Sequence, residues 1–322
     1  MHAATAAKIG SGCIYEKYTS RINSSNIVRT GITHAFGVNM EHPVARKITV
    51  VQMSKPSRFV VADPDGSIQS HLAQLLRRFE PVGLLDIREA ALQDRVDIKY
   101  VLTFAQLLEV LPALSKDYKI LEVSGNRLNH YRTLYFDTPA FDLYNMHVNG
   151  RADRYKVRSR EYADTSFSVF EVKHKTRKDR TIKERMVTEK PLVNISGTDK
   201  EWLGAVMPAS SMKLEPKIWN SFSRITLVNC NSCERVTIDL NIAFSSEQKA
   251  INLDHLVVIE AKLESAGCRS PFVEMMRSKH IHEQSFSKYC IGISMLYEQV
   301  KKNSLKPQLL QINKIIAGAQ HE

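Results

Sequence analysis

Hydrophobic and polar residues alternate along much of the chain between Arg78 and Lys302, and this alternation predicts β-strands. Short turns join several of the neighbouring strands, so antiparallel pairing is expected. The expected strands lie near residues 94–102, 119–124, 130–136, 153–162, 166–175, 221–230, 234–242 and 255–263. Helical spacing and capping signals predict helices from Ser67, after Thr103, at Asp137-Thr138-Pro139, near Pro271 and over 285–300.

The ends of the chain carry weaker patterns than the middle. Residues 1–77 show no sustained period and include the turn signal Asp63-Pro64-Asp65-Gly66, which predicts a poorly structured or partly helical extension. Residues 78–302 are expected to form one compact domain, and residues 303–322 a C-terminal tail. The fold class expected for residues 78–302 is α+β, with helices flanking an antiparallel sheet.

One predicted strand has an unusual distribution of charge. In the stretch Arg154-Tyr155-Lys156-Val157-Arg158-Ser159-Arg160, all four cations fall on the same face, because strand side chains alternate. Neighbours on that face lie about 6.6 Å apart. At an effective dielectric constant near 20 each adjacent pair repels by about 2.5 kcal/mol, and by about 0.6 kcal/mol in water. Either this face is solvated, or an anion neutralises it.

The same arrangement recurs in other predicted strands, where charged residues share one face and mostly apolar residues the other. Examples are Glu171 with Lys173 and Glu260 with Lys262. Across five strands, a closed antiparallel β-tunnel with a polar, basic lumen explains the pattern better than five solvated faces do. About eight strands are expected to line this tunnel.

Composition narrows the class of ligand. The chain has 45 Lys and Arg against 34 Asp and Glu, a net charge of +11, which favours a polyanionic partner. The sequence shows no apolar run of transmembrane length and no secretory signal. Its five scattered cysteines suit a reducing compartment. A cytoplasmic protein is therefore expected.

The charges expected in the lumen are strongly unbalanced. The cations are Arg95, Lys99, Arg154, Lys156, Arg158, Arg160, Lys173, Lys175, Lys183, Arg185, Arg224, Arg235, Lys262 and Lys288. The carboxylates are Asp97, Glu171, Asp239 and Glu260. Arginine donates two parallel hydrogen bonds to a phosphate group, and carboxylate oxygens suit Mg²⁺ or Mn²⁺ shared with phosphates. A dense phosphate chain with a divalent metal is the ligand that this set fits.

Several segments together resemble one known family. They are Arg95-Val-Asp-Ile-Lys-Tyr-Val101, Tyr135-Phe-Asp-Thr-Pro139, Arg154-x-Lys-Val-Arg-x-Arg160, Phe170-Glu-Val-Lys-x-Lys175, Ser223-Arg224, Arg235-Val-Thr-Ile-Asp239, Ile259-Glu-x-Lys262 and Phe286-Ser-Lys-Tyr289. In order and spacing they resemble the VTC (vacuolar transporter chaperone) polyphosphate polymerase domain, a branch of the triphosphate tunnel metalloenzymes. The resemblance spans about Arg78 to Gln299.

The resemblance implies an activity and roles for the residues. The implied reaction transfers the γ-phosphate of ATP onto a growing polyphosphate chain, with Mn²⁺ or Mg²⁺ as the metal. Glu260 resembles the metal-binding glutamate, with Asp239, Glu171 and Asp97 as weaker candidates. The implied catalytic residues are Lys99, Arg158, Arg160, Lys173, Arg224, Arg235 and Lys288. The implied substrate-binding residues are Arg95, Arg154, Lys156, Lys175, Lys183, Arg185 and Lys262.

Three alternatives to the polymerase stay open from the sequence. A tunnel of this kind could bind polyphosphate or nucleotide without catalysis, or could hydrolyse triphosphates. The hydrolase branch carries a Glu-x-Glu-x-Lys signature where this chain has Arg95, Asp97 and Lys99, which favours the polymerase branch. A nucleic-acid binder would spread its cations over an outer face, so no nucleic-acid partner is expected. Eukaryotic polymerases of this kind are joined to membrane-spanning regions, so a separate membrane-protein partner would be consistent with the resemblance.

Overall fold

The fold is given by a computed structural model of the chain. It describes residues 67–87, 96–178, 180–207, 213–265 and 267–318. The chain divides into two units, residues 1–54 and 55–322, and all described residues belong to the second. Of the predicted site residues, Arg95 lies outside the described residues.

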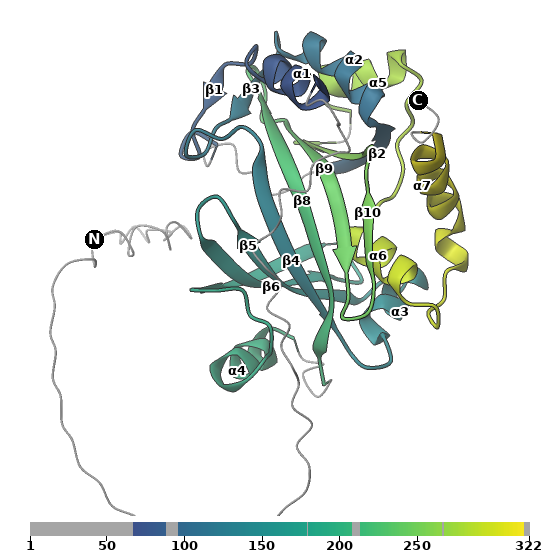
Figure 1. Cartoon of the computed structure of the whole chain (residues 1–322). Coiled ribbons are helices and arrows are strands. Elements are labelled where there is room, and N and C mark those ends of the chain that lie inside the picture. Colours follow the sequence, from purple (N-terminus) through teal and green to yellow (C-terminus); the bar gives the residue numbers. More distant parts are fainter. Residues whose placement is uncertain (1–66, 88–95, 179, 208–212, 266, 319–322) are drawn as a thin grey trace, which may run out of the picture. The chain divides into compact units, whose positions relative to one another are not determined.

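A single large antiparallel sheet forms the centre of the described unit (Figure 1). Its strands pair in the order β2-β11-β9-β8-β4-β5-β6-β7, and every pair along this path is antiparallel. The bounds are β2 (Val96–Thr103), β11 (Leu256–Leu263), β9 (Arg235–Ser245), β8 (Glu215–Asn229), β4 (Asn129–Asp137), β5 (Arg154–Tyr162), β6 (Phe167–Lys175) and β7 (Thr181–Thr188). Short strands β3 (Tyr118–Leu121), β1 (Pro81–Val82) and β10 (Ala250–Leu253) add to this path. The structure thus confirms the α+β class and the antiparallel sheet.

All eight predicted strands are present, and two differences stand out. β8 begins six residues earlier than expected, at Glu215 rather than 221. β7 was not predicted as a strand, because Glu184 interrupts the apolar positions Ile182 and Met186 on one face of Thr181–Thr188. Its Lys183 and Arg185 nevertheless lie on the charged face to which the sequence assigned them, in register with β6.

The sheet does not close into the expected barrel. Within the described residues, β2 and β7 end the strand path and are not paired with each other, so the prediction of a closed tunnel is wrong in this respect. The outer edge of β2 is met instead by an irregular segment, because Gln284 N donates to the carbonyl of Lys99 at 2.8 Å. Charged residues on β7 blunt the other edge, as is common for edge strands.

Helices α1 (Ser67–Leu76), α2 (Phe104–Leu114) and α5 (Pro271–Ser278) cover the outer face of one half of the sheet (Figure 1). Leu107, Leu111 and Phe272 are fully buried there against apolar side chains of β2, β11, β9 and β8. The helix expected after Thr103 is confirmed. Its capping box is complete, since Thr103 Oγ1 accepts from Gln106 N at 3.1 Å and Gln106 Oε1 from Thr103 N at 2.9 Å.

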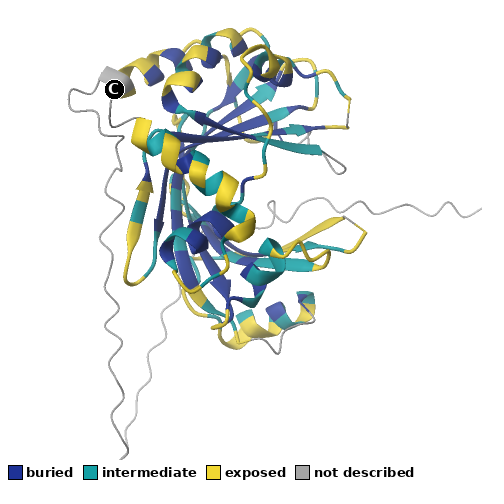
Figure 2. Cartoon of the chain, turned by 90° about the vertical axis from the view of Figure 1, so that its right-hand side faces the viewer, coloured by how far each residue is buried: buried dark blue, intermediate teal, exposed yellow. Residues whose placement is uncertain are grey.

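Helix α4 (Gly197–Val206) covers the outer face of the other half. Its Leu203 packs in one cluster with Val157, Phe170 and Val172 from β5 and β6. Figure 2 shows the buried strands lying between these outer helices. Apolar burial on this side fixes the strand faces, so the charged residues of β5 and β6 must point to the opposite, inner face.

The inner face is filled at one end by α6 (Lys288–Leu296), with α3 (Asp142–Val148) and α7 (Lys306–Gly318) beside it. Nearly every residue of α6 is buried, against Val101 of β2, Tyr135 of β4 and Phe244 of β9 among others. Both α1 and α7 lie outside the 78–302 range and add to the cores. None of the described helices is long and apolar enough to cross a membrane.

Asp137 connects α3 to α6. The helix predicted to begin at Asp137 begins at Asp142, because Asp137 is still the last residue of β4. Its buried carboxylate accepts from the backbone N–H groups of Thr138, Leu143 and Tyr144 at 2.7–2.9 Å, and from the Tyr289 hydroxyl of α6. A single carboxylate therefore caps α3 and fixes the position of α6.

Gly292 lets α6 approach the sheet closely. A Cβ at this position would lie 2.6 Å from Phe244 Cδ1 and 2.7 Å from Ile218 Cδ1, both in buried side chains. We expect Gly292→Ala to lower the free energy of unfolding by about 1–3 kcal/mol, as overpacking does. Gly318→Ala is the control, because a Cβ there meets nothing within 4 Å. Equal thermal midpoints for both variants would contradict this close packing.

Candidate functional site

Strand register gathers the predicted charged residues on the inner face. Arg158 lies opposite Glu171, which lies opposite Arg185, while Lys156, Lys173 and Lys183 form the next row. Burial lowers the pKa of Lys173, whereas the charges of Glu260 on β11 and Asp97 on β2 act to raise it. Strand β6 therefore faces those two strands across the inner side of the sheet. The described cations on this face are Lys99, Arg154, Lys156, Arg158, Arg160, Lys173, Lys175, Lys183, Arg185, Arg224, Arg235, Lys262 and Lys288. Four carboxylates, Asp97, Glu171, Asp239 and Glu260, share it.

Glu171 is the most heavily paired of these carboxylates. It contacts Arg158 Nη2 at 2.5 Å, Lys183 Nζ at 2.8 Å and Arg185 Nε at 2.9 Å, and its side chain is only 1% exposed. Burial alone would raise the pKa of Glu171. The charges of Arg158 and Lys183 outweigh burial and hold the pKa well below its usual range. Glu171 is thus an ionised counter-charge that holds three cations in place.

Asp239 is also a buried carboxylate that is paired with cations of the inner face. Arg224 grips it with two hydrogen bonds, Nε to Oδ1 at 2.5 Å and Nη2 to Oδ2 at 2.8 Å, and Lys288 of α6 contacts Oδ2. Burial opposes ionisation, but Arg224 and then Lys288 lower the pKa of Asp239 to about 2. The pair fixes Arg224 in a forked geometry that suits oxygen ligands.

Glu260 is more accessible than Glu171 and Asp239. Its oxygens contact Lys99 Nζ and Lys262 Nζ, each at 2.6 Å, and 23% of its side chain is exposed against 4% for Asp239. Burial would raise the pKa of Glu260, yet Lys262 and Lys99 lower it well below the ordinary value. An ionised, partly exposed carboxylate fits a role as a metal ligand.

No complete metal site exists among the described side chains. They contain no group of three or more His, Cys, Asp or Glu residues that could hold a metal ion. Mg²⁺ typically takes one or two carboxylates and completes its shell with phosphate oxygens and water. Glu260, with Asp97 on the neighbouring strand, fits that partial set, whereas the nearly inaccessible Glu171 does not.

A row of three lysines crosses β5, β6 and β7 with no carboxylate directly opposite. Lys156, Lys173 and Lys183 occupy one register line, where facing side chains lie about 5 Å apart. Burial lowers the pKa of all three, and that of Lys183 falls to about 7 despite its contact with Glu171. Lys156 Nζ donates to Ser287 Oγ, the capping residue of α6, at 3.0 Å. Three positive charges in a row repel one another, and a bound anion would neutralise them.

Two aromatic rings line the face beside Arg224, and sequence reasoning missed both. Tyr131 and Phe222 stack with ring centroids 5.1 Å apart, and Arg224 lies 5.1–5.2 Å from each centroid. Arg160 lies 5.7 Å from both rings and donates to Thr133 Oγ1 at 3.1 Å. The signal available for Tyr131 was its position in the alternation of β4, on the same strand face as Thr133 and on the opposite face from Leu134.

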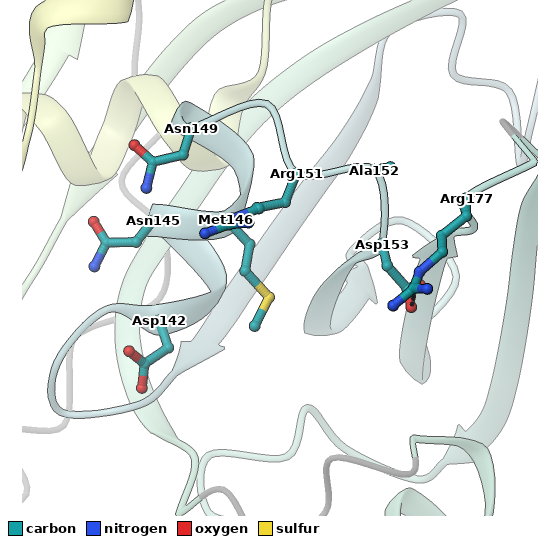
Figure 3. Close-up of a pocket in the computed structure, with 8 residues that line it drawn as sticks. All are labelled: Asp142, Asn145, Met146, Asn149, Arg151, Ala152, Asp153 and Arg177. Atoms are coloured by element: carbon teal, nitrogen blue, oxygen red, sulfur yellow. Dashed lines mark ion pairs between the residues drawn. The ribbon is translucent and has the colours of Figure 1, made fainter.

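A pocket of about 850 Å³ lies elsewhere, beside α3 (Figure 3). The residues that line it are Asp142, Asn145 and Met146 of α3, and Asn149, Arg151, Ala152, Asp153 and Arg177. None of the predicted site residues contributes to it. The candidate site is therefore the charged inner face of the sheet and not this pocket.

The comparison with protein families agrees with this geometry. The model of the VTC domain matches residues 94–297, more than half of the chain. The chain belongs to the VTC domain family. The matched span begins just before β2 and ends just after α6, so this VTC domain contains every predicted site residue. The family predicted from the sequence is confirmed.

Solved structures with a similar fold are distant in sequence. A putative adenylate cyclase from Bacillus halodurans is 13% identical, covers 64% of this chain and 98% of its own, and has a TM-score of 0.41. A putative adenylyl cyclase from Hippeastrum, described as having a dominant triphosphatase activity, is 14% identical with the same coverages and TM-score. None of the curated proteins matches the sequence. The assignment to the VTC domain family rests on the family match.

Proposed function

We propose that this VTC domain binds polyphosphate on the inner face of its sheet and extends it with the γ-phosphate of ATP. The observation that carries the proposal is the row Lys156–Lys173–Lys183, which has no carboxylate opposite it in the register. Thirteen described cations share the face with four carboxylates, so a bound polyanion would relieve their mutual repulsion. A linear phosphate chain, with one charge or more per unit, matches successive rows of cations along the strands.

Each part of the face has a distinct task in this proposal. Arg158, Arg160 and Arg224 would grip phosphate oxygens, while Glu171 and Asp239 hold Arg158 and Arg224 in place. The terminal phosphate oxygen of the chain would attack the γ-phosphorus, the bond to the β–γ bridging oxygen would break, and ADP would leave. The attacking oxygen is already ionised, so positioning and charge stabilisation suffice without a general base.

A divalent metal fits this scheme through Glu260. Glu260, supported by Asp97, would hold the ion, which supplies positive charge to phosphate oxygens. Both carboxylate oxygens of Glu260 now contact lysines, so Lys99 and Lys262 must share Glu260 with the ion or turn to the phosphates. Mn²⁺ or Mg²⁺ would satisfy the oxygen ligands.

Incubation of the purified protein with ATP and Mn²⁺, with and without a short polyphosphate primer, tests the reaction. We expect long phosphate chains on a sizing gel and an equal amount of ADP for each phosphate added. Free phosphate without chains would instead indicate triphosphate hydrolysis. No turnover under any metal would overturn the proposed synthesis.

One observation favours a second candidate, a polyphosphate-binding module without catalysis. Glu171, Asp239 and Glu260 are each paired with two or three cations, and the described residues form no metal cluster of three or more ligands. Such a module would bind polyphosphate with or without metal and leave ATP unchanged. The same incubation, combined with a binding measurement, separates the two functions.

The pKa of Lys183 predicts a pH dependence of binding. With a pKa of about 7 in the free protein, Lys183 loses its charge as the pH rises through 7, whereas a bound polyanion favours the protonated form. Affinity should therefore fall by up to about 10-fold between pH 6 and pH 8, with proton uptake on binding. Lys183→Arg keeps its charge, so the affinity ratio of wild type to this variant isolates the effect from titration of the phosphates. A ratio that does not change with pH would contradict it.

A further inference from the structure

Two aromatic rings on the inner face lie between two arginines. Tyr131 of β4 and Phe222 of β8 are opposite each other in the strand register, and their rings are parallel to within 3°. Arg224 lies one register row to one side of this pair, and Arg160, opposite Thr133, lies one row to the other side. The two rings therefore separate Arg160 from Arg224.

Phe222 is in contact with three cations that come from three different elements. Arg224 of β8 lies 5.1 Å from its centroid, Arg160 of β5 lies 5.7 Å away, and Lys288 Nζ of α6 lies 4.5 Å away. Both arginines are at nearly the same distances from Tyr131, 5.2 and 5.7 Å. All of these distances fall within the range of about 6 Å over which a ring attracts a cation.

The three cations repel one another, and carboxylates offset only part of that repulsion. Asp239 pairs with Arg224 and Lys288, whereas Arg160 makes no ion pair with a described carboxylate and donates instead to Thr133 Oγ1. Burial lowers the pKa of Arg160, and the neighbouring cations, Arg224 among them, lower it further. Burial also lowers the pKa of Lys288, with Asp239 opposing this shift and Arg224 adding to it.

An aromatic ring can hold a cation in a way that a carboxylate cannot. The negative face of the ring attracts the cation through the ring quadrupole, but it carries no net charge that would neutralise the cation. The ring also accepts no conventional hydrogen bond from the cation, so the N–H donors stay available to an anion. Cations held by a ring are therefore fixed in position and still suited to phosphate.

We propose that Phe222, together with Tyr131, is a positioning residue of the phosphate site. Its ring holds Arg160, Arg224 and Lys288 in one arrangement against their mutual repulsion, so that all three can bind the same stretch of polyphosphate. The ring acts through these cations and not by contact with the phosphate. This inference rests on the proposed function, because it requires that polyphosphate binds on the inner face.

Fluorination of Phe222 tests this role, because fluorine withdraws electrons from the ring face and changes the size of the ring little. The full chain is prepared with mono-, di- or trifluorophenylalanine at position 222, and the affinity of each protein for polyphosphate of defined length is measured by calorimetry. We expect affinity to fall with each added fluorine, by about 3-fold to 10-fold in total for the trifluorinated protein. A role in packing alone would not produce this dependence on electron density.

The matched control is the same fluorinated series at Phe170. This residue is fully buried on the outer side of the sheet, where its ring lies 5.8 Å from that of Phe136 and 5.4 Å from that of Trp202. Fluorination there changes a buried ring without touching the three cations. Affinity for polyphosphate should stay within about 2-fold of wild type throughout the Phe170 series.

Two results would overturn the positioning role. One is an affinity that stays constant or rises as fluorine is added at Phe222. The other is an equal fall in the Phe170 series, since the loss would then come from packing. Wild-type protein that binds no polyphosphate would refute the proposed function and the positioning role with it, whereas an unchanging Phe222 series with intact wild-type binding refutes the positioning role alone.

Discussion

Glu260→Gln is expected to lower ATP-dependent chain synthesis by at least about 100-fold while leaving polyphosphate binding intact or stronger. The substitution removes one negative charge between Lys99 and Lys262, each 2.6 Å from the carboxylate. In the proposed function Glu260 holds the divalent ion, so this variant would lose that ligand and phosphoryl transfer would slow. A bound polyanion, by contrast, could pair with Lys99 and Lys262, which no longer neutralise a carboxylate between them. Opposite changes in turnover and in affinity are the signature of a metal ligand.

The control for this variant is Glu201→Gln, which removes the same charge from an exposed position on α4. It should leave both quantities within about 2-fold of wild type. Turnover by Glu260→Gln at the wild-type rate would remove Glu260 from any metal role. Loss of turnover together with an equal loss of affinity would indicate a distorted site instead.

Glu171→Gln is expected to destabilise the free protein by about 3 kcal/mol, because Arg158, Lys183 and Arg185 lose their shared counter-charge. For a domain of this size that corresponds to a fall of very roughly 6–12 °C in the thermal midpoint. Polyphosphate should restore most of this loss, since it supplies the missing negative charge to the same cations. Thermal unfolding with and without polymer measures both changes.

Glu184→Gln is the matched control, because Glu184 lies on the opposite, outer face of the neighbouring strand β7, opposite Val172. Its midpoint and its stabilisation by polymer should both equal those of wild type. A Glu171→Gln protein that is destabilised but gains no more from polymer than wild type would mean that phosphate does not contact this cluster.

The inner face could be predicted because alternation along a strand needs only the local sequence. Arg154, Lys156, Arg158 and Arg160 share one face in the structure as they do in the pattern, and the apolar Val157 faces α4. The pairing of three cations with Glu171 could not be predicted from the sequence, because it depends on the register of β5, β6 and β7. Register follows from turn geometry and packing rather than from strand composition.

The sequence could not predict that β2 and β7 stay unpaired within the described residues, or what fixes the positions of the helices. In Thr181–Thr188 the charged Glu184 stands between Ile182 and Met186, so no clear alternation identified β7, and closure of the barrel could not be judged from it. Asp137 looked like an ordinary helix cap, yet its main partners include Tyr289, 152 residues away. Contacts between segments so far apart in the chain leave no periodic signal in either one.

The most direct test of the central claim is a calorimetric titration of polyphosphate of defined length into wild type, Lys173→Gln and Lys200→Gln. Each variant removes one positive charge, from the lysine row of the inner face or from the exposed outer surface of α4. The inner-face site predicts that Lys173→Gln weakens binding by at least about 10-fold and lowers its salt dependence, while Lys200→Gln stays within about 2-fold of wild type. Equal weakening by both variants, or none by Lys173→Gln, would contradict a phosphate site on the inner face.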